Sequence, residues 1–140
     1  MTPNDSKPTS EPTCGQELAA SAEVQEKWSA LMNRVAANME THAAWVGDGS
    51  AAARREQSGM LRVAAAYREM AAAAARAAAV MMAMKDLPPA PHDRAKMDRR
   101  ALAAWMREKI ALQRELVALI ARHADESEQA LAELGGPGAS

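Results

Sequence analysis

Phenylalanine is absent from this chain of 140 residues, which contains one tyrosine and one cysteine. No segment alternates Val, Ile, Thr or aromatic residues with polar ones, so the sequence lacks the pattern of a β-strand. Long runs also lack glycine and proline and consist mainly of Ala, Leu, Met, Arg, Glu and Gln, which are strong helix formers. The composition therefore predicts an all-α protein, and the length predicts one domain.

Further absences narrow the class of function. The single cysteine, Cys14, excludes an internal disulfide and fits a reducing compartment. The net charge is −1, whereas nucleic-acid binders usually carry a basic excess, so we expect no nucleic-acid partner. The longest apolar run, residues 70–84, is too short for a transmembrane segment and contains Arg76. With no signal peptide, phosphate loop, zinc motif or catalytic triad, we expect a cytoplasmic protein that is not an enzyme and has no cofactor.

Helix breakers and capping residues divide the chain. Thr13 and Gln16 have the spacing of a capping box, and Ser50 follows a glycine-containing break as an N-cap. Three prolines in four residues then end the second helix. The expected segments are a disordered tail over 1–12, helices over about 15–45, 51–85 and 93–134 with a proline-rich loop at 86–92, and a flexible tail over 135–140. Short connections predict an elongated antiparallel bundle of three long helices, completed by oligomerisation.

The middle helix is the most apolar of the three and is predicted to be the central one. Between Met60 and Met84, two apolar lines run side by side with alternating spacings of three and four residues. A helix that is apolar over most of its circumference must be covered on several sides. Only a narrow polar stripe remains, with its members seven residues apart: Arg55, Arg62, Glu69 and Arg76.

The outer helices carry larger apolar residues. In the first helix, an apolar line predicts the core face and contains Val24, Trp28, Leu31, Val35 and Met39, then His42 or Ala43, then Trp45 or Val46. In the third helix, the main stripe contains Ala103, Met106, Ile110, Gln113, Val117, Ile120, Ala124, Ser127, Leu131 and Leu134. The flanking stripe contains Leu102, Trp105, Leu112, Leu116, Leu119 and His123. Three helices do not cover both stripes, and the sequence does not determine which one faces inward.

An uncovered apolar stripe predicts a surface for a protein partner or a second copy of the chain. We therefore expect a non-enzymatic interaction or structural module that forms a homo-oligomer, most simply a homodimer. The bulky side chains that anchor either this interface or the core are Trp28, Trp45, Tyr67, Trp105, Leu112, Leu116 and Leu119.

The alternative is a ferritin-like bundle that binds iron or another transition metal. Such sites combine carboxylates and histidines from several helices. His123 and Glu126 are three residues apart and share a helix face, and His42 and Glu69 are further candidate ligands. The chain contains no Glu-x-x-His pair, and Glu69 is about 30 Å along the helix axis from the level of His42.

The turn between the first two helices reads Trp45–Val46–Gly47. A Trp-x-Gly turn between two long helices resembles the WXG100 family of small helical hairpins, over residues 17–85. The resemblance implies a dimer of hairpins that is exported by a specialised secretion system. It also implies that Trp45 packs across the end of the hairpin and that Gly47 permits the turn. The chain differs from that family in its third long helix, and Tyr67 is followed four residues later by Ala71 instead of an acidic residue.

Overall fold

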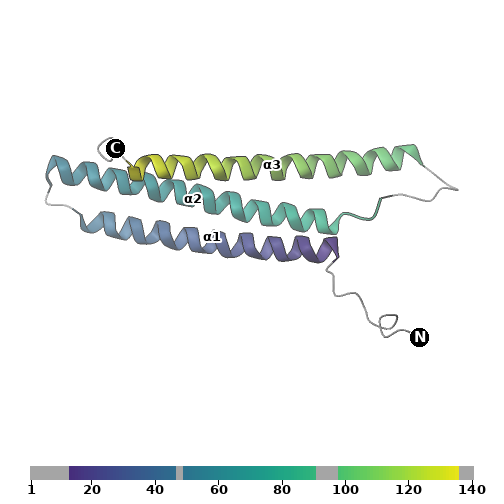
Figure 1. The fold of residues 1–140 in the computed structure, drawn as a ribbon, viewed down its shortest axis with the longest axis horizontal. Coiled ribbons are helices and arrows are strands. Elements are labelled where there is room, and N and C mark those ends of the chain that lie inside the picture. Colours follow the sequence, from purple (N-terminus) through teal and green to yellow (C-terminus); the bar gives the residue numbers. More distant parts are fainter. Residues whose placement is uncertain (1–12, 47–48, 91–97, 136–140) are drawn as a thin grey trace, which may run out of the picture.

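A computed structural model describes residues 13–46, 49–90 and 98–135. These residues form three long helices, α1 (Cys14–Trp45), α2 (Ala51–Asp86) and α3 (Arg99–Gly135). The helices run antiparallel to their sequence neighbours and form an elongated bundle (Figure 1). The prediction of an all-α bundle of three long helices is confirmed. The predicted N-terminal tail, Gly47, residues 91–97 and residues 136–140 lie outside the described residues, while Gly135, placed in the predicted C-terminal tail, is the last residue of α3.

Local signals at the helix starts agree with the sequence. The Thr13 hydroxyl accepts a hydrogen bond from the backbone N–H of Gln16, whose side chain accepts one from the Thr13 N–H, so the capping box is present. The Ser50 hydroxyl accepts a hydrogen bond from the backbone N–H of Ala53 and so caps the start of α2. In the described residues α3 begins at Arg99, and Asp98 caps it by accepting from two backbone N–H groups. The predicted start near residue 93 falls outside the described part of the chain.

Helix α2 occupies the middle of the bundle, as its apolar circumference predicts. It packs against α1 on one side and α3 on the other, while α1 and α3 make no close backbone approach to each other in the described residues (Figure 1). Eleven of the fifteen buried apolar residues are alanines, so the core contains few large side chains. One cluster joins all three helices and includes Met32 of α1, Val63 and Met70 of α2, and Ala130 of α3.

The face of α1 that packs against α2 carries mostly small side chains. Its buried residues are Ala22, Ser29, Met32, Ala36 and Ala43. The Ser29 hydroxyl donates a hydrogen bond to the backbone carbonyl oxygen of Ala71 at 2.7 Å. Small residues allow the helix backbones to approach closely across the alanine surface of α2. A tryptophan at the contact would hold them apart.

The predicted core face of the first helix is therefore wrong for its largest members. Val24, Trp28 and Leu31 are exposed. Ala43, not His42, is the buried residue near the end of α1, and Trp45 is 79% exposed. The prediction assumed that the largest apolar side chains of the first helix face the core. The alanine surface of α2 instead packs against the face of α1 that carries the smallest side chains.

Helix α3 packs on α2 through its flanking stripe. Leu112, Leu116 and Leu119 are half-buried there, and Trp105 Nε1 donates a hydrogen bond to the carbonyl oxygen of Pro88 at 2.6 Å. Most of the main stripe faces away from α2 and leaves six large apolar side chains exposed, namely Met106, Ile110, Val117, Ile120, Leu131 and Leu134. Ser127 is the exception, because it is half-buried and its hydroxyl lies 3.0 Å from the sulfur of Met70 on α2. The structure thus answers the question of which stripe faces inward.

Ion pairs between the polar stripe of α2 and α3 favour this orientation. The pairs are Arg62–Glu133 at 3.0 Å, Arg76–Glu115 at 2.6 Å, and Glu69–Arg122. The signs of the paired residues alternate along both helices, so a shift of α3 by one heptad in either direction replaces one attractive pair by a repulsive one. One direction sets Glu69 against Glu115, and the other sets Arg76 against Arg122. Each exposed pair contributes little free energy, but together they select one register.

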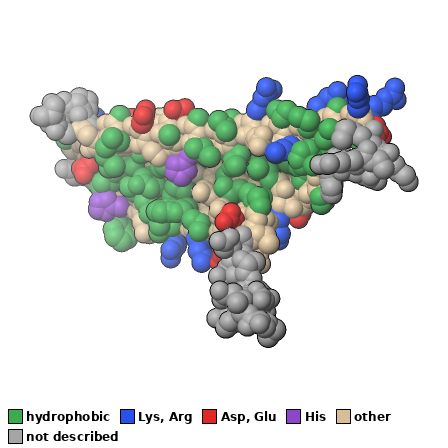
Figure 2. Space-filling model, turned by 45° about the vertical axis from the view of Figure 1, so that its right-hand side comes forward, with side chains coloured by type: hydrophobic (Ala, Val, Ile, Leu, Met, Phe, Trp, Pro, Cys, Tyr) green, Lys and Arg blue, Asp and Glu red, His purple; other side chains and the backbone are tan. Residues whose placement is uncertain are grey.

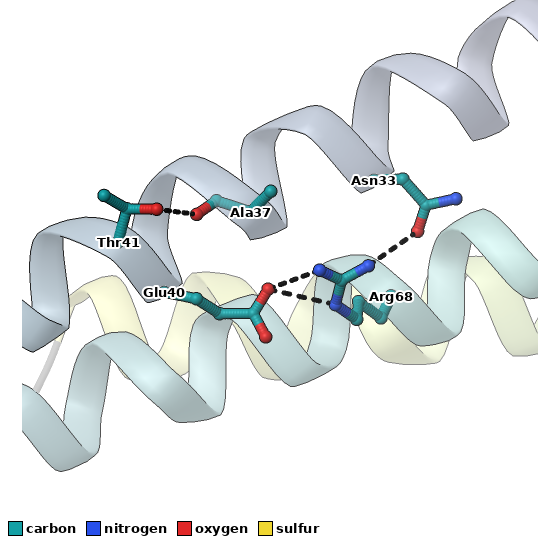
Figure 3. A network of polar contacts seen from close by, with 5 residues as sticks. All are labelled: Asn33, Ala37, Glu40, Thr41 and Arg68. Atoms are coloured by element: carbon teal, nitrogen blue, oxygen red, sulfur yellow. Dashed lines mark hydrogen bonds and ion pairs between the residues drawn. The ribbon is translucent and has the colours of Figure 1, made fainter.

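On the other side of α2, a smaller polar network links it to α1. The Arg68 guanidinium donates hydrogen bonds to a carboxylate oxygen of Glu40 and to the side-chain oxygen of Asn33 (Figure 3). The hydrogen bond to Glu40, together with the attraction of its charge, raises the pKa of Arg68. The network lies at the rim of the interface, where its charged groups stay in contact with water.

Candidate functional site

The site with the clearest shape is an apolar groove that runs along α2 between α1 and α3. Its floor is formed by α2 and its walls by the two outer helices, which do not meet above it in the described residues. In the space-filling view, hydrophobic side chains gather along the middle of the molecule, and charged side chains lie mainly at its edges (Figure 2). We refer to this feature as the α1–α3 groove.

The middle of the α1–α3 groove contains a hollow of about 440 Å³. Trp28 of α1 lines one wall, and Ile120 and His123 of α3 line the other. The floor consists of alanines of α2 together with Met81. Because both walls carry large apolar side chains over a floor of small ones, the hollow has the form of a socket for apolar side chains.

A second hollow of about 1280 Å³ lies nearer the α1–α2 turn. Val35 and His42 of α1 and Leu134 of α3 are among its lining residues, and charged residues of α2 and α3 line it as well, namely Arg54, Arg55, Glu56, Arg62 and Glu133. These positions continue the walls of the first hollow at heptad spacing, since Val35 and His42 follow Trp28 at intervals of seven and Leu134 follows Ile120 at fourteen. The two hollows therefore lie at successive levels along α2, and the part of the core cluster that contains Met32, Met70 and Ala130 lies between them.

The main stripe of α3 forms one edge of the groove and extends beyond it. Ile110 and Val117 line a shallow hollow of about 410 Å³ on the side of α3, where Arg114 also lies. Val117 is 66% exposed and Leu131 69% exposed. An apolar heptad stripe exposed along most of a helix is the pattern of one strand of a coiled coil without its partner.

The predicted anchor residues separate into three groups. Tyr67 packs against the core cluster, and Trp105 and the three leucines of the flanking stripe lie half-buried against neighbouring parts of the chain. Trp28 forms a wall of the α1–α3 groove and is about half exposed. Trp45 is exposed and does not belong to the core. The predicted anchors do not include Val117, Ile120 and Leu131, which belong to the main stripe and whose heptad spacing is visible in the sequence.

The structure does not bring the four candidate metal ligands together. His42 and His123 line different hollows of the groove. Glu69 forms an ion pair with Arg122. Within residues 13–46, 49–90 and 98–135, no group of three or more His, Cys, Asp or Glu side chains has the arrangement needed to hold a metal ion.

Comparison with protein-family models, with curated proteins and with solved structures found no match for this chain. The resemblance of the Trp45–Val46–Gly47 turn to the WXG100 family therefore stays a prediction. Among the described residues, no helix combines the length and the apolar character needed to cross a bilayer.

Proposed function

We propose that this protein is a non-enzymatic helical interaction module that acts through exposed apolar helix faces and associates with itself. The single observation that carries the proposal is the distribution of large and small apolar residues. The interior is built mainly from alanine, while eleven large hydrophobic side chains are exposed in the described part of the chain. A protein usually buries its largest apolar side chains first, because each contributes about 1.5–3 kcal/mol when fully buried.

The exposed residues are not scattered over the surface. Trp28 and Leu31 lie on α1, and Ile120 and Leu134 on α3. Trp28, Ile120 and Leu134 also line the α1–α3 groove. Single exposed apolar side chains are normal, but continuous apolar surfaces mark sites where another chain packs. The proposal assigns this surface, rather than a catalytic centre, as the functional part of the molecule.

The test compares oligomeric state between two matched surface substitutions on α3. Val117→Asp places a charge on the main stripe, and Gln129→Asp places the same charge at an exposed position outside it. Size-exclusion chromatography with light scattering measures the mass of each purified protein over a concentration series. Circular dichroism of each variant confirms that the helices are formed.

We expect the unmodified protein and Gln129→Asp to show a mass above 14.9 kDa that rises with concentration, and Val117→Asp to remain monomeric. If the unmodified protein is monomeric throughout the series, or if both variants associate as it does, the proposed self-association through this surface is wrong.

A further inference from the structure

The main stripe of α3 has the features of one helix of a two-stranded coiled coil. The spacing between its successive members alternates between three and four residues from Ala103 to Leu134. This is the spacing of heptad positions a and d. The flanking stripe already packs against α2, so the six exposed large side chains of the main stripe are available to a second helix, while Ser127 also contacts Met70 of α2. The remaining question is which helix covers it.

The charge of α3 answers this question. Residues 99–114 contain five basic residues and one acidic residue, a net charge of +4. Residues 115–135 contain one basic residue and five acidic residues, a net charge of −4 with His123 neutral. Helix α3 runs from right to left in Figure 1. Along the upper edge of Figure 2, basic side chains lie toward the right and acidic side chains toward the left. An antiparallel copy of α3 sets the basic half of each helix beside the acidic half of the other, whereas a parallel copy sets halves of like charge together.

Several of these charges are not used within the chain. The ion pairs with α2 involve Glu115, Arg122 and Glu133. In the described residues, four others form no ion pair and flank the main stripe on its solvent side: Arg107, Arg114, Asp125 and Glu128. The first two are basic and lie in the first half of α3, and the last two are acidic and lie in the second half.

We propose that the main stripe of α3 pairs with the main stripe of a second copy in antiparallel orientation, about a two-fold axis that passes between residues 118 and 119. This inference rests on the proposed self-association and specifies its geometry. The position of the axis follows from the two ends of the main stripe. With the axis there, Ala103, the first residue of the stripe, is level with Leu134, the last residue of the stripe in the second copy. Every a position then meets a d position, which is the layer pattern of antiparallel coiled coils.

In two of its layers this register pairs a large side chain with a small one. Ile110 meets Ser127 of the second copy, and Leu134 meets Ala103. At the centre, Val117 meets Ile120 in two symmetry-related layers, which fills the middle of the contact with branched apolar side chains. On the flank, Arg107 comes within two residues of the level of Glu128, and Arg114 comes equally close to the level of Asp125. Each oppositely charged pair occurs twice because of the symmetry.

Disulfide trapping in mixtures of single-cysteine proteins tests the orientation. In a Cys14→Ser background, Met106→Cys and Leu131→Cys are purified separately, mixed, and equilibrated in a glutathione redox buffer. The antiparallel register sets position 106 against position 131 of the second copy, so mass spectrometry should show the mixed disulfide in excess over both homodisulfides. The matched control replaces Leu131→Cys with Gln129→Cys, which lies at nearly the same level but outside the main stripe, and should give little mixed disulfide.

Charge reversal gives an independent readout. Arg107→Glu and Glu128→Arg should each weaken dimerisation by about five- to tenfold, because each change affects two symmetry-related pairs. The double variant should recover most of the affinity of the unmodified protein. Light scattering of the same samples reports the oligomeric state separately.

The outcomes distinguish this inference from the proposed function. A dimer that forms mainly homodisulfides at positions 106 and 131 would be parallel and would overturn the antiparallel register while self-association stands. A dimer with no trapping above the Gln129→Cys control would place the interface elsewhere. A protein that is monomeric throughout would overturn both proposals.

Discussion

Val80→Ala and Val117→Ala remove the same two methyl groups from two helices of the same protein, and their comparison separates core packing from association. Val80 is 1% exposed and Val117 is 66% exposed. Both positions are helical, so the gain in helix propensity from valine to alanine, about 0.5 kcal/mol, is common to both variants. The difference between the two changes therefore reports burial alone.

The expected magnitudes follow from these exposures. Full burial of two methyl groups contributes about 1.6 kcal/mol, so after the propensity gain Val80→Ala should destabilise the fold by about 1–2 kcal/mol including the cavity. Val117 is about one third buried, and its truncation removes about 0.5 kcal/mol from the isolated chain, which the propensity gain offsets. Covering the remainder in a dimer adds about 1 kcal/mol per copy, or about 2 kcal/mol per dimer, which corresponds to about 30-fold in the dimer dissociation constant.

Chemical denaturation at two protein concentrations measures both effects. The cost of Val80→Ala should be similar at low and high concentration. The cost of Val117→Ala should be close to zero at low concentration and should increase at high concentration, because only the associated state buries this side chain further. A Val117→Ala variant that matches the unmodified protein at both concentrations would refute the assignment of this residue to an interface.

Three further predictions concern the fold itself. Gly49→Ala should destabilise the protein by about 1 kcal/mol, because Gly49 has a φ of +80°. Gly59→Ala within α2 should stabilise the protein by about 0.5–1 kcal/mol. The thermal unfolding temperatures of the two variants should therefore shift in opposite directions. Ser29→Ala should cost about 1 kcal/mol in denaturant unfolding by removing the buried hydrogen bond to α2, and an unchanged midpoint would contradict the role of that bond. Arg68→Gln should lower the melting temperature by a small amount that shrinks in 1 M salt, because its bond to Glu40 is screened there; a salt-independent loss would indicate packing instead of charge.

The starts of the first two helices could be predicted from the sequence because the capping residues that set them act within one helical turn. Thr13 with Gln16 and Ser50 satisfy backbone groups within one turn of each helix start, so sequence spacing alone predicts these caps. The start of α3 was less predictable, since several residues near the proline-rich loop are capable of capping and the structure uses Asp98. The central position of α2 could be predicted because α2 is apolar around most of its circumference, and one neighbouring helix cannot cover that much surface.

The orientation of the outer helices could not be predicted from hydrophobicity. On α1 the larger apolar residues, such as Trp28, lie on the outward face. On α3 both faces carry large apolar residues, with Val117 exposed on one and Leu116 half-buried on the other. The features that determine which face of an outer helix packs inward depend on that helix and on α2 together. On α3 the alternating charges of Arg62, Glu69 and Arg76 on α2 select the facing side, and on α1 the alanine surface of α2 selects small partners.

An exposed apolar surface could be predicted from the sequence, but its position on the helices could not. The sequence contains more apolar helix surface than three helices bury, which indicates an interface without locating it. Trp28 lies in the groove, whereas Tyr67 and Trp105 serve packing within the chain. The metal candidates His42 and His123 were grouped by residue type, and their separation into different hollows depends on the antiparallel helix packing.

The most direct test of the central claim is a sedimentation dilution series on the unmodified full chain under reducing conditions, which exclude a disulfide through Cys14. The claim that the main stripe is a self-association surface predicts that the mass rises from 14.9 kDa in dilute solution toward twice that value with increasing concentration. A constant mass of 14.9 kDa up to the highest concentration that remains soluble would contradict it.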